Sequence, residues 1–326
     1  MDNNILCKIH TVVVHGGNFH ADDLFTVAYL LKYFDFIGVP ITYKRTFQIT
    51  DEMTLENGYI VADIGLGEFD HHQKEELKQK RANGTAYAAF GLVVKTFHDT
   101  YLSEEEYQML DKIFIEDLDR HDNYGTPNHL SLAIGSFNMN WDKDIDQKLQ
   151  KQLDRKKPTA NPNETYTFED SLKRTRYFSL HDGEWEEMFY QKNDDDRFAY
   201  ALIVATNILD KMIDNVKASI RAKKLINMSD VENRVLHLKK WAPVEEFLTD
   251  NDSIDFLGFW NTRGSYSILS IRDKYGKNKK LFPEKFRGFS SKTPNEYGML
   301  FCHASGFIAS FVDDTIAKHF MENYTF

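Results

Sequence analysis

This sequence has few cysteines and no long apolar run, and both absences narrow the class of protein. Its two cysteines, Cys7 and Cys302, provide neither a disulfide framework nor a thiolate metal cluster. No apolar stretch approaches the ~20 residues that a membrane-spanning helix needs. The first residues also lack the basic start, apolar stretch and small-residue cleavage site of a signal peptide. We therefore expect an intracellular, cytoplasmic protein without a membrane segment.

An excess of positive charge is also absent. The chain has 40 Lys and Arg against 50 Asp and Glu, which gives a formal net charge of −10. Long-range attraction to a long polyanion is therefore weak, and the charge favours a small or short substrate. One stretch, Arg272 to Arg287 (RDKYGKNKKLFPEKFR), is locally basic. It is typical of a solvated hairpin that carries lysines, and the alternative is a local patch that binds nucleic acid.

Apolar and aromatic residues, in contrast, are plentiful. The 326 residues are 42% hydrophobic and include 25 Phe and 16 Tyr. This is enough for two domains with real cores, and it argues against disorder. The sequence shows no internal repeat and no low-complexity tract.

The first part of the chain alternates strands and helices. Lys8 to Val14 is a β-branched run that predicts a buried strand, and Ser103, with Glu106 three residues later, predicts a helix N-cap. This alternation predicts a parallel α/β sheet. The elements expected here are strands at residues 8–14, 41–46 and 59–64 and helices at 24–34, 85–97 and 104–121.

A polar segment and one long helical pattern follow. Residues 151–170 carry two of the seven prolines and are typical of a loop or insertion, and residues 151–192 match no pattern that assigns them a role. Residues 197–225 predict a single helix that connects two domains, which we place at residues 1–210 and 211–326. The elements expected beyond it are strands at 235–238, 254–260, 266–271 and 299–303, a hairpin turn at 262–265 and a closing helix at 306–324.

Four groups of acidic and histidine residues stand out, and three of them follow a predicted strand. In open parallel sheets, ligands bind outside the carboxyl ends of the strands, so we expect all four groups to converge there. The groups are His15, His20 and Asp22 in HGGNFHADD; Asp63 in YIVAD; Asp70, His71 and His72 in FDHHQ; and Asp119 and Asp122 in EDLDRHDN.

Crowded carboxylates and imidazoles need a cation among them, and a divalent metal provides one. Mixed His and Asp ligands suit Mn²⁺, Fe²⁺, Co²⁺ or Zn²⁺ better than Mg²⁺ or Ca²⁺, which prefer oxygen ligands. Taken singly, each group has an ordinary explanation: His15 as a structural histidine, Asp22 and Asp23 as a helix start, and the His71–His72 pair as surface residues. Their joint order and strand-end placement favour a metal site, and the charge of three ligating aspartates favours two ions.

Seven motifs follow one another along nearly the whole chain. They are VHGGNFHADD (14–23), VADIG (61–65), FDHHQ (69–73), DRHDN (119–123), WAPVEEFL (241–248), FRG (286–288) and FCHASGFI (301–308). Through these motifs the chain resembles the DHH phosphoesterase superfamily, and more closely the melanocyte-proliferating-gene (Myg-type) family of metal-dependent hydrolases.

The resemblance implies an N-terminal parallel-sheet DHH-type catalytic domain and a smaller C-terminal α/β domain that binds substrate, with the active site in the cleft between them. It implies phosphoester hydrolysis with two divalent ions, usually Mn²⁺, and the 3′-to-5′ exonuclease activity on RNA that is attributed to eukaryotic members. Asp63 would bridge the ions, with His15 and His20 completing one of them. The implied metal ligands are His15, His20, Asp22, Asp63, His71 and Asp122.

Further roles follow for the residues beside the metals. One of His71 and His72 would face the ions and the other the substrate phosphate. Asp70 would orient a histidine, and His72 would stabilise the phosphoryl oxygens or protonate the leaving group.

The C-terminal domain would contribute the substrate-binding residues. Arg287 would bind a phosphate through its planar fork. His303 and the backbone amides of Ser305 and Gly306, at a helix N-terminus, would form an anion seat; the alternative for Gly306 is a simple strand-to-helix turn. Departures from the family pattern affect the substrate pocket rather than the metal ligands: Asp23 replaces a Glu, Tyr124 replaces a Gly, and AAFG (88–91) replaces a Ser-rich helix start.

Three classes of function remain. The first is a nuclease or oligonucleotide phosphodiesterase acting on single-stranded RNA or DNA, and both the basic stretch and the resemblance favour it. The second is a hydrolase of small phosphates such as a cyclic dinucleotide, a nucleotide or pyrophosphate, which the net charge favours. The third is a non-catalytic interaction protein that a metal stabilises, and the complete set of predicted ligands argues against it. The oligomeric state is left open.

Overall fold

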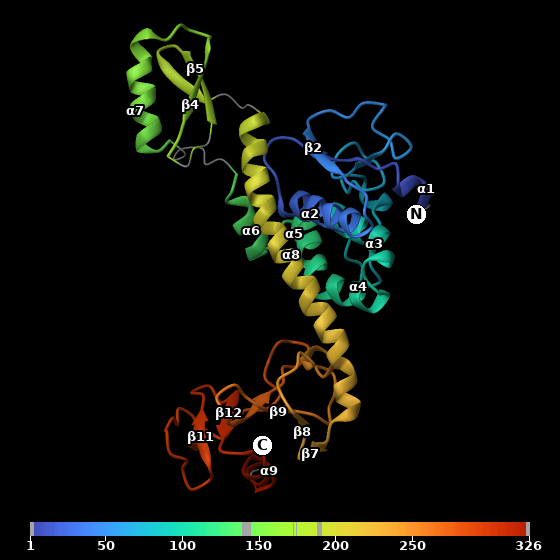
Figure 1. Cartoon of the computed structure of the whole chain (residues 1–326), viewed down its shortest axis with the longest axis vertical. Coiled ribbons are helices and arrows are strands. Elements are labelled where there is room, and N and C mark those ends of the chain that lie inside the picture. Colours follow the sequence, from blue (N-terminus) through green and yellow to red (C-terminus); the bar gives the residue numbers. More distant parts are fainter. Residues whose placement is uncertain (1–2, 139–144, 172, 174, 188–190, 324–326) are drawn as a thin grey trace. The chain divides into compact units, whose positions relative to one another are not determined.

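The computed structural model describes residues 3–138, 145–171, 173, 175–187 and 191–323. The chain forms two compact units, Met1–Ile213 and Asp214–Phe326, and each is described by itself (Figure 1). Both combine helices with sheets, so the predicted α/β class is confirmed. No helix in the described ranges is both long and apolar enough to cross a membrane.

A parallel sheet lies near the start of the first unit. It consists of β1 (Thr11–His15), β2 (Thr42–Thr46) and β3 (Tyr59–Val61) in the order β2-β1-β3. Val12, Val13 and Val14 in the central strand are fully buried. A strand covered on both faces reads as a continuous apolar run, which is why its sequence does not alternate. The predicted strands at 41–46 and 59–64 are confirmed.

Helices complete this part of the unit. Ser103 caps α4 as predicted: its side chain accepts the N–H of Glu106, and the Glu106 side chain accepts the N–H of Ser103. A π-helical stretch (Asp111–Ile115) continues α4 into α5, and Gly125 at φ 64° ends α5 in a left-handed turn. The helices are α1 (Asn3–Leu6), α2 (Ala21–Phe36), α3 (Ala89–Phe97), α4 (Glu104–Leu110), α5 (Glu116–Tyr124) and α6 (His129–Gly135), with 3₁₀ turns at Glu75–Leu77 and His98–Thr100.

The segment expected to be a loop or insertion has a fold of its own. The helix α7 (Gln147–Lys156) packs on an antiparallel sheet of β4 (Thr165–Glu169), β5 (Thr175–His181) and β6 (Glu184–Glu187). The loop prediction for residues 151–170 is therefore wrong. The core of this segment is small, so few apolar residues mark it in the sequence. That core is Leu149, Leu153, Phe168 and Phe178.

One long helix, α8 (Gln191–Met228), follows, and the prediction of a single helix here is confirmed. The boundary between the two units falls within it, after Ile213. The second unit holds a six-stranded sheet in the order β11-β12-β10-β9-β8-β7, in which β8 and β9 run parallel. The elements are β7 (Val231–Glu232), β8 (Val235–Leu238), β9 (Phe256–Trp260), β10 (Tyr266–Ser270), β11 (Met299–Cys302), β12 (Ile308–Phe311) and α9 (Asp314–Asn323), with 3₁₀ turns at Glu245–Phe247 and Glu284–Phe286.

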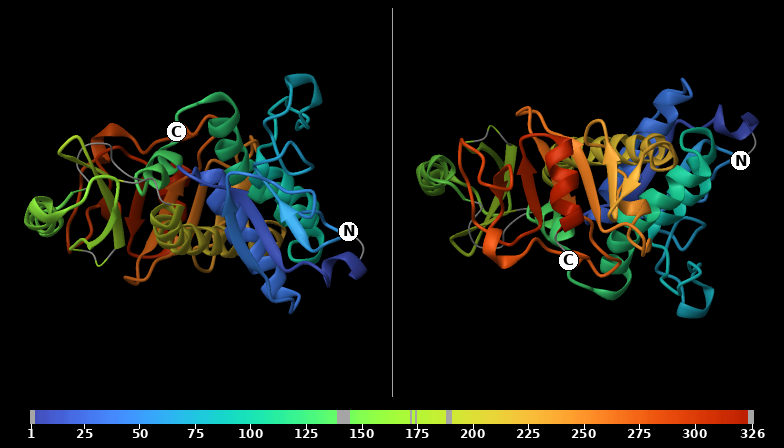
Figure 2. Two further views of the ribbon diagram at one scale, coloured as in Figure 1. Left: turned by 90° about the horizontal axis from the view of Figure 1, so that it is seen from above. Right: turned by 90° about the horizontal axis from the view of Figure 1, so that it is seen from below.

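The second unit buries both faces of its sheet. On one face α9 packs through Phe320 against Phe282 and Phe311. Figure 2 shows this helix, in red, beside the strands of the sheet. On the other, Ala222 of α8 packs with Leu236 and Leu257. The helix predicted at 306–324 is wrong in its first part, because Ile308–Phe311 pairs between β10 and β11 as a strand. A four-residue apolar run does not distinguish strand from helix, and only its pairing decides.

Candidate metal centre

The carboxyl ends of β1 and β3 gather the predicted ligands. His15 is the last residue of β1, and Asp63 lies two residues after β3 in a left-handed conformation (φ 58°) that Asp tolerates better than most residues. Phe69 pairs with Ala62 in a parallel bridge, which places the following Asp-His-His beside the sheet. His20 precedes α2 directly, and Asp122 lies on α5.

His15, His20, Asp23 and Asp63 form one group of converging ligand atoms, all within 4.8 Å of one another. His15 Nε2 is 2.9 Å from Asp23 Oδ2 and 3.4 Å from Asp63 Oδ2. Its other nitrogen, Nδ1, lies 2.9 Å from the Gly16 carbonyl oxygen, to which it donates. In the neutral tautomer Nε2 therefore points a lone pair at two carboxylates, which is the orientation of a metal-binding histidine.

Asp22, Asp63, His71 and Asp122 form the second group, within the same 4.8 Å. His71 Nε2 is 2.9 Å from Asp63 Oδ1 and 2.7 Å from Asp122 Oδ2, and its Nδ1 lies 3.3 Å from Asn123 Oδ1. Asp63 belongs to both groups and also to a third, smaller one with His71 and His72. Its Oδ2 faces His15 and its Oδ1 faces His71, which is the position of a bridging carboxylate.

Several polar atoms in these groups are buried and make no hydrogen bond of proper geometry, although the histidines and carboxylates lie within ion-pair distance of one another. They are both carboxylate oxygens of Asp63, Oδ1 of Asp23 and Nε2 of His71. Leaving such atoms unsatisfied costs free energy, and a cation between them removes that cost. The residues present therefore fit a divalent metal ion, and Asp63 is shared by the groups that could hold one.

Charge balance supports the same conclusion. Burial lowers the pKa of His15, but the carboxylates of Asp23 and Asp63 beside its Nε2 favour the protonated ring, outweigh burial and raise the pKa to about 11. Burial likewise lowers the pKa of His71, and Asp122 and Asp63 raise it to about 11. Without metal, the protein thus neutralises its clustered carboxylates with protons on imidazoles. A metal ion would replace those protons.

Asp22 has a second task beside its place in the cluster. Its Oδ1 accepts the N–H of Phe90 (2.9 Å) and its Oδ2 accepts that of Ala89 (3.0 Å), in the first turn of α3. Gly91, one residue on, donates its N–H to Asp119 Oδ1 (3.2 Å). A Cβ at Gly91 would lie 2.0 Å from the Asp119 carboxylate, so a glycine is required there. The small residues of AAFG let α3 begin against two carboxylates.

Two residues differ from their expected places. Asp23, expected only at a helix start, joins His15 in the first group. The sequence signal that could have found Asp23 is its position three residues after His20. In the structure Asp23 accepts the His20 N–H from there (2.9 Å). Asp119 instead binds Arg81 Nη2 (2.6 Å), and Arg81 also binds Asp111 through two nitrogens. Burial raises the pKa of Asp119 to about 7 even though Arg81 lowers it. Nothing in the sequence marks Arg81.

His71 and His72 differ in exposure, although each offers an atom that converges with Asp63 within 4.8 Å. The side chain of His71 is 5% exposed and that of His72 is 57% exposed. Asp70 Oδ1 lies 2.8 Å from His72 Nδ1 and also accepts the His72 N–H, while Oδ2 accepts the Leu66 N–H (2.6 Å). Asp70 thus fixes the ring of His72 with Nδ1 as the donor and leaves Nε2 directed away from Asp70.

The predicted substrate-binding residues lie together in the second unit. His303, Ser305 and Gly306 form the turn between β11 and β12, and Arg287 lies in the segment before β11. His303 Nδ1 accepts the Ser305 N–H (3.1 Å), and the Gly306 N–H donates to the His303 carbonyl (2.8 Å). Gly306, at φ 75°, leaves room for Arg287, whose Nε would be 2.6 Å from an added Cβ. This turn belongs to a hairpin, so the predicted helix N-terminus is wrong. A role in substrate binding stays a prediction.

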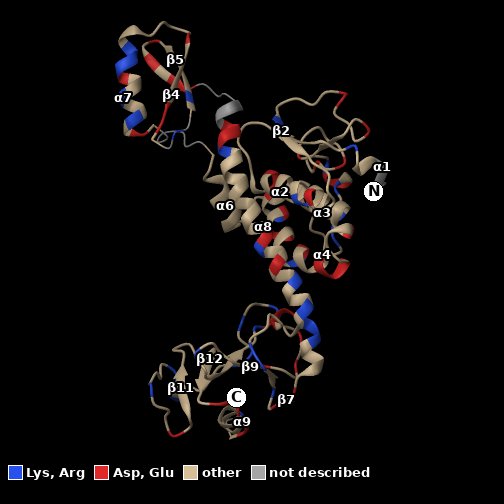
Figure 3. Cartoon of the chain, in the orientation of Figure 1, with Lys and Arg blue, Asp and Glu red and all other residues tan. Residues whose placement is uncertain are grey.

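Charge is distributed unevenly along the chain. Residues 1–213 carry 36 Asp and Glu against 23 Lys and Arg, whereas residues 214–326 carry 14 against 17. Figure 3 shows acidic residues on α4 and basic residues along the second half of α8. In the predicted basic stretch, Arg272 binds Glu245 (3.1 Å), and Lys279 Nζ donates to the carbonyls of Leu248, Asn251 and Ile254. Part of this stretch therefore stabilises its own unit.

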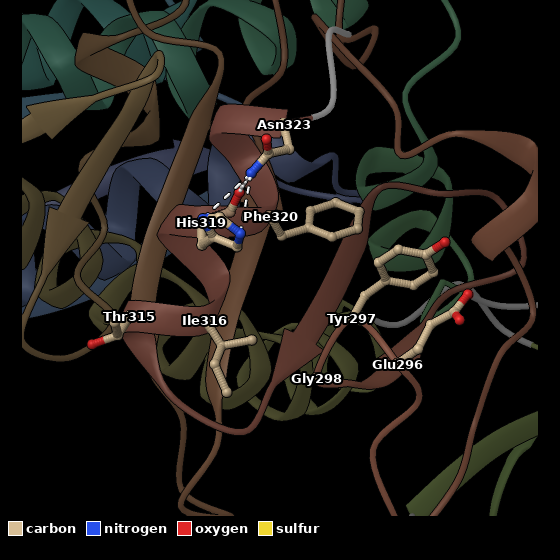
Figure 4. Close-up of a pocket in the computed structure, with 8 residues that line it drawn as sticks. All are labelled: Glu296, Tyr297, Gly298, Thr315, Ile316, His319, Phe320 and Asn323. Atoms are coloured by element: carbon tan, nitrogen blue, oxygen red, sulfur yellow. Dashed lines mark hydrogen bonds between the residues drawn. The ribbon is translucent and has the colours of Figure 1, made fainter.

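A pocket of about 550 Å³ lies between α9 and the segment before β11 (Figure 4). The aromatic rings of Tyr297 and Phe320 line it, and Asn323 donates to the His319 carbonyl at its edge (2.7 Å). Among the described residues, the groups with converging metal ligands lie elsewhere, in the first unit. The pocket has no set of groups that points to a reaction.

Comparison with known proteins gives one family. The family model MYG1_exonuc, described as an uncharacterised protein family (UPF0160), matches residues 11–322. A search of curated proteins found no match. The matched region contains both ligand groups and the turn between β11 and β12.

Proposed function

The chain belongs to this MYG1_exonuc family, and from that premise we propose that it is a dinuclear metal-dependent phosphoesterase of the DHH type. Its substrate would be single-stranded RNA or DNA, cleaved as a 3′-to-5′ exonuclease or as an oligonucleotide phosphodiesterase. The observation that carries the proposal is Asp63, whose two buried oxygens face two different groups of ligand atoms, one at His15 and one at His71.

Two ion sites would be formed by the chain's own residues. One site would use His15, His20, Asp23 and Asp63, and the other Asp22, Asp63, His71 and Asp122. Two divalent ions, which we propose to be Mn²⁺, would lower the pKa of water and stabilise charge on the attacking and leaving oxygens of phosphorus. The Gly16 carbonyl and Asn123 hold the ring of His15 and of His71 in the tautomer that presents Nε2.

His72 would act on the substrate rather than on the ions. Its side chain is more than half exposed, and Asp70 holds its Nδ1 at 2.8 Å. A histidine fixed in this way can donate a proton from Nε2 to the leaving oxygen when it is protonated, or bind a phosphoryl oxygen. Asp70 is then a positioning residue, because it touches His72 and not the reacting atoms.

The choice of nucleic acid rests on two supports. The matching family is named for an exonuclease. The second unit, where Arg287 and His303 lie, carries a small excess of basic residues in an otherwise acidic chain. A hydrolase of small phosphates is the second candidate, and the net charge of −10 favours it. The third candidate, a non-catalytic interaction protein that a metal stabilises, would hold its metal at the same ligand atoms, so only turnover of a substrate separates it from the other two.

A turnover screen with Mn²⁺ tests the proposal. Wild-type protein is compared on RNA labelled at either end, short oligonucleotides, a cyclic dinucleotide and pyrophosphate. Asp63→Asn should lose at least 100-fold in turnover and most of its bound Mn²⁺, because one oxygen becomes an amide that cannot bridge two ions. Asp35→Asn, an exposed change on α2, is the matched control.

The outcomes separate the candidates. A ladder of products from labelled RNA supports the nuclease. The polarity follows from the label: a 3′-to-5′ exonuclease gives a ladder from RNA labelled at the 5′ end and releases a 3′ label in its first steps. Turnover of pyrophosphate alone selects the small-phosphate hydrolase. No turnover of any substrate by metal-loaded wild type refutes an enzyme.

A further inference from the structure

The segment after β2 places an aromatic ring against the backbone that follows His15, a predicted metal ligand. β1 and β2 are parallel and in register, with His15 opposite Thr46, so both strands end at the same edge of the sheet. Phe47 is the next residue after Thr46. Its side chain is 64% exposed although the residue lies at this edge.

The ring of Phe47 lies against the two glycines that follow His15. A Cβ on Gly16 would be 3.0 Å from Phe47 Cε2, and one on Gly17 would be 3.2 Å from Cε1. Gly17 has a positive φ of 78°, but Gly16 does not. The backbone conformation of Gly16 would therefore allow a side chain. The close approach of the Phe47 ring disfavours one there.

The same segment is anchored a second time. Ile49 packs on Gly65, with Cγ1 3.1 Å from the position of an added Cβ. Gly65 follows Asp63 by two residues. Phe47 thus contacts the glycines that follow His15, and Ile49 contacts the loop after β3 that carries Asp63. This fixes one side of the ring against backbone next to the ligand cluster.

An exposed apolar side chain is common on protein surfaces and needs no explanation by itself. The position of Phe47 is what distinguishes it: one side rests on backbone next to a predicted metal ligand, and much of the ring remains open to solvent. A flat aromatic surface at such a place offers a stacking site to a base, and every base has a π-face. Pyrophosphate and inorganic polyphosphate have no such group.

We propose that Phe47 is a stacking platform for a nucleobase next to the phosphodiester that is cleaved, so that the preferred substrate carries bases. The inference rests on the proposed function, because the substrate must reach the ligand cluster. Stacking on a ring is tolerant of sequence, so we expect little preference among the four bases. Phe47 is thus a specificity-determining residue for nucleotides over inorganic phosphates.

The test combines changes in the protein and in the substrate. An RNA pentamer and five pentamers with one abasic residue, each at a different position, are hydrolysed with Mn²⁺ by wild type, Phe47→Ala and Phe47→Trp. Phe36→Ala is the matched control, since Phe36 is 58% exposed at the end of α2. Phe47→Ala should lower kcat/KM on the intact pentamer by about 5- to 150-fold, the range measured for loss of one stacked base. Phe47→Trp should keep most of the activity.

The abasic substrates separate stacking from a structural role. The pentamer that lacks the stacked base should already be hydrolysed slowly by wild type. Phe47→Ala should not slow its hydrolysis further, because removing the base and removing the ring abolish the same contact. Equal losses on every pentamer, or no loss on any, would overturn the proposal.

A binding measurement keeps the inference distinct from the proposed function. A pentamer containing the fluorescent base 2-aminopurine is titrated with each protein, and stacking quenches its fluorescence. If wild type shows no turnover, the proposed function fails. Quenching by wild type but not by Phe47→Ala would still support the platform, and absence of quenching by wild type overturns it.

Discussion

Binding of Mn²⁺ should release protons, and the number released follows from two histidines. In the metal-free protein the pKa values of His15 and His71 are raised to about 11, because Asp23, Asp63 and Asp122 hold their protonated rings. At pH 7 to 8 both rings therefore carry a proton. A metal ion binds only the neutral imidazole, so each histidine must lose its proton when it becomes a ligand.

The expected magnitude is about two protons for each protein molecule that binds two ions. Each displaced proton changes the apparent affinity about tenfold per pH unit, or about 1.4 kcal/mol. The combined affinity for both ions should therefore rise about 100-fold from pH 6.5 to 7.5. Any proton held by Asp22 or Asp23, whose pKa values burial raises, adds to this number.

Calorimetry measures this release directly. Mn²⁺ is titrated into metal-free protein at pH 7.5 in several buffers with different ionisation enthalpies, and the slope of heat against that enthalpy gives the protons released. His71→Ala should lower the number by about one while the His15 group still binds. His98→Ala, which removes a histidine that contacts Glu104, should leave it unchanged. Release of fewer than one proton by wild type would refute the assignment of these rings as ligands.

Two further predictions concern stability. The pKa values of His15 and His71 are higher in the folded metal-free protein than the ordinary value of 6.5, so their stabilisation is complete below about pH 6.5 and is lost as pH rises through about 11. The Tm of protein in chelator should therefore fall between pH 7 and 10, while Mn²⁺ should raise Tm more at pH 8 than at pH 6.5; a Tm in chelator that rises over this range would contradict the ion pairs. Arg81→Met should lower the free energy of unfolding by about 3–5 kcal/mol, because it leaves Asp119 buried without its cation. Urea unfolding measures this loss of stability. Arg120→Met, at a more exposed ion pair, is the control. Equal losses from the two changes would show that the buried pair stabilises the fold no more than the exposed one.

The sequence by itself determined the elements whose signals are local. A β-branched run such as Val12 to Val14 suits a buried strand, and Ser103 with Glu106 satisfies the backbone N–H groups that a helix start leaves free. The order of the four acidic and histidine groups was equally local, and the rule that ligands bind at the carboxyl ends of parallel strands was enough to expect them together. All six predicted ligands do lie in the two groups.

Only the tertiary structure decided which carboxylate serves which purpose. Asp23 meets His15 because β1 and the start of α2 face each other, whereas Asp119 meets Arg81, which is 38 residues away in the sequence. Ile308–Phe311 became a strand because β10 and β11 provide backbone partners for it. Side-chain chemistry and short-range spacing are written in the sequence, but the partner of each group depends on contacts between distant segments, and those exist only once the chain has folded.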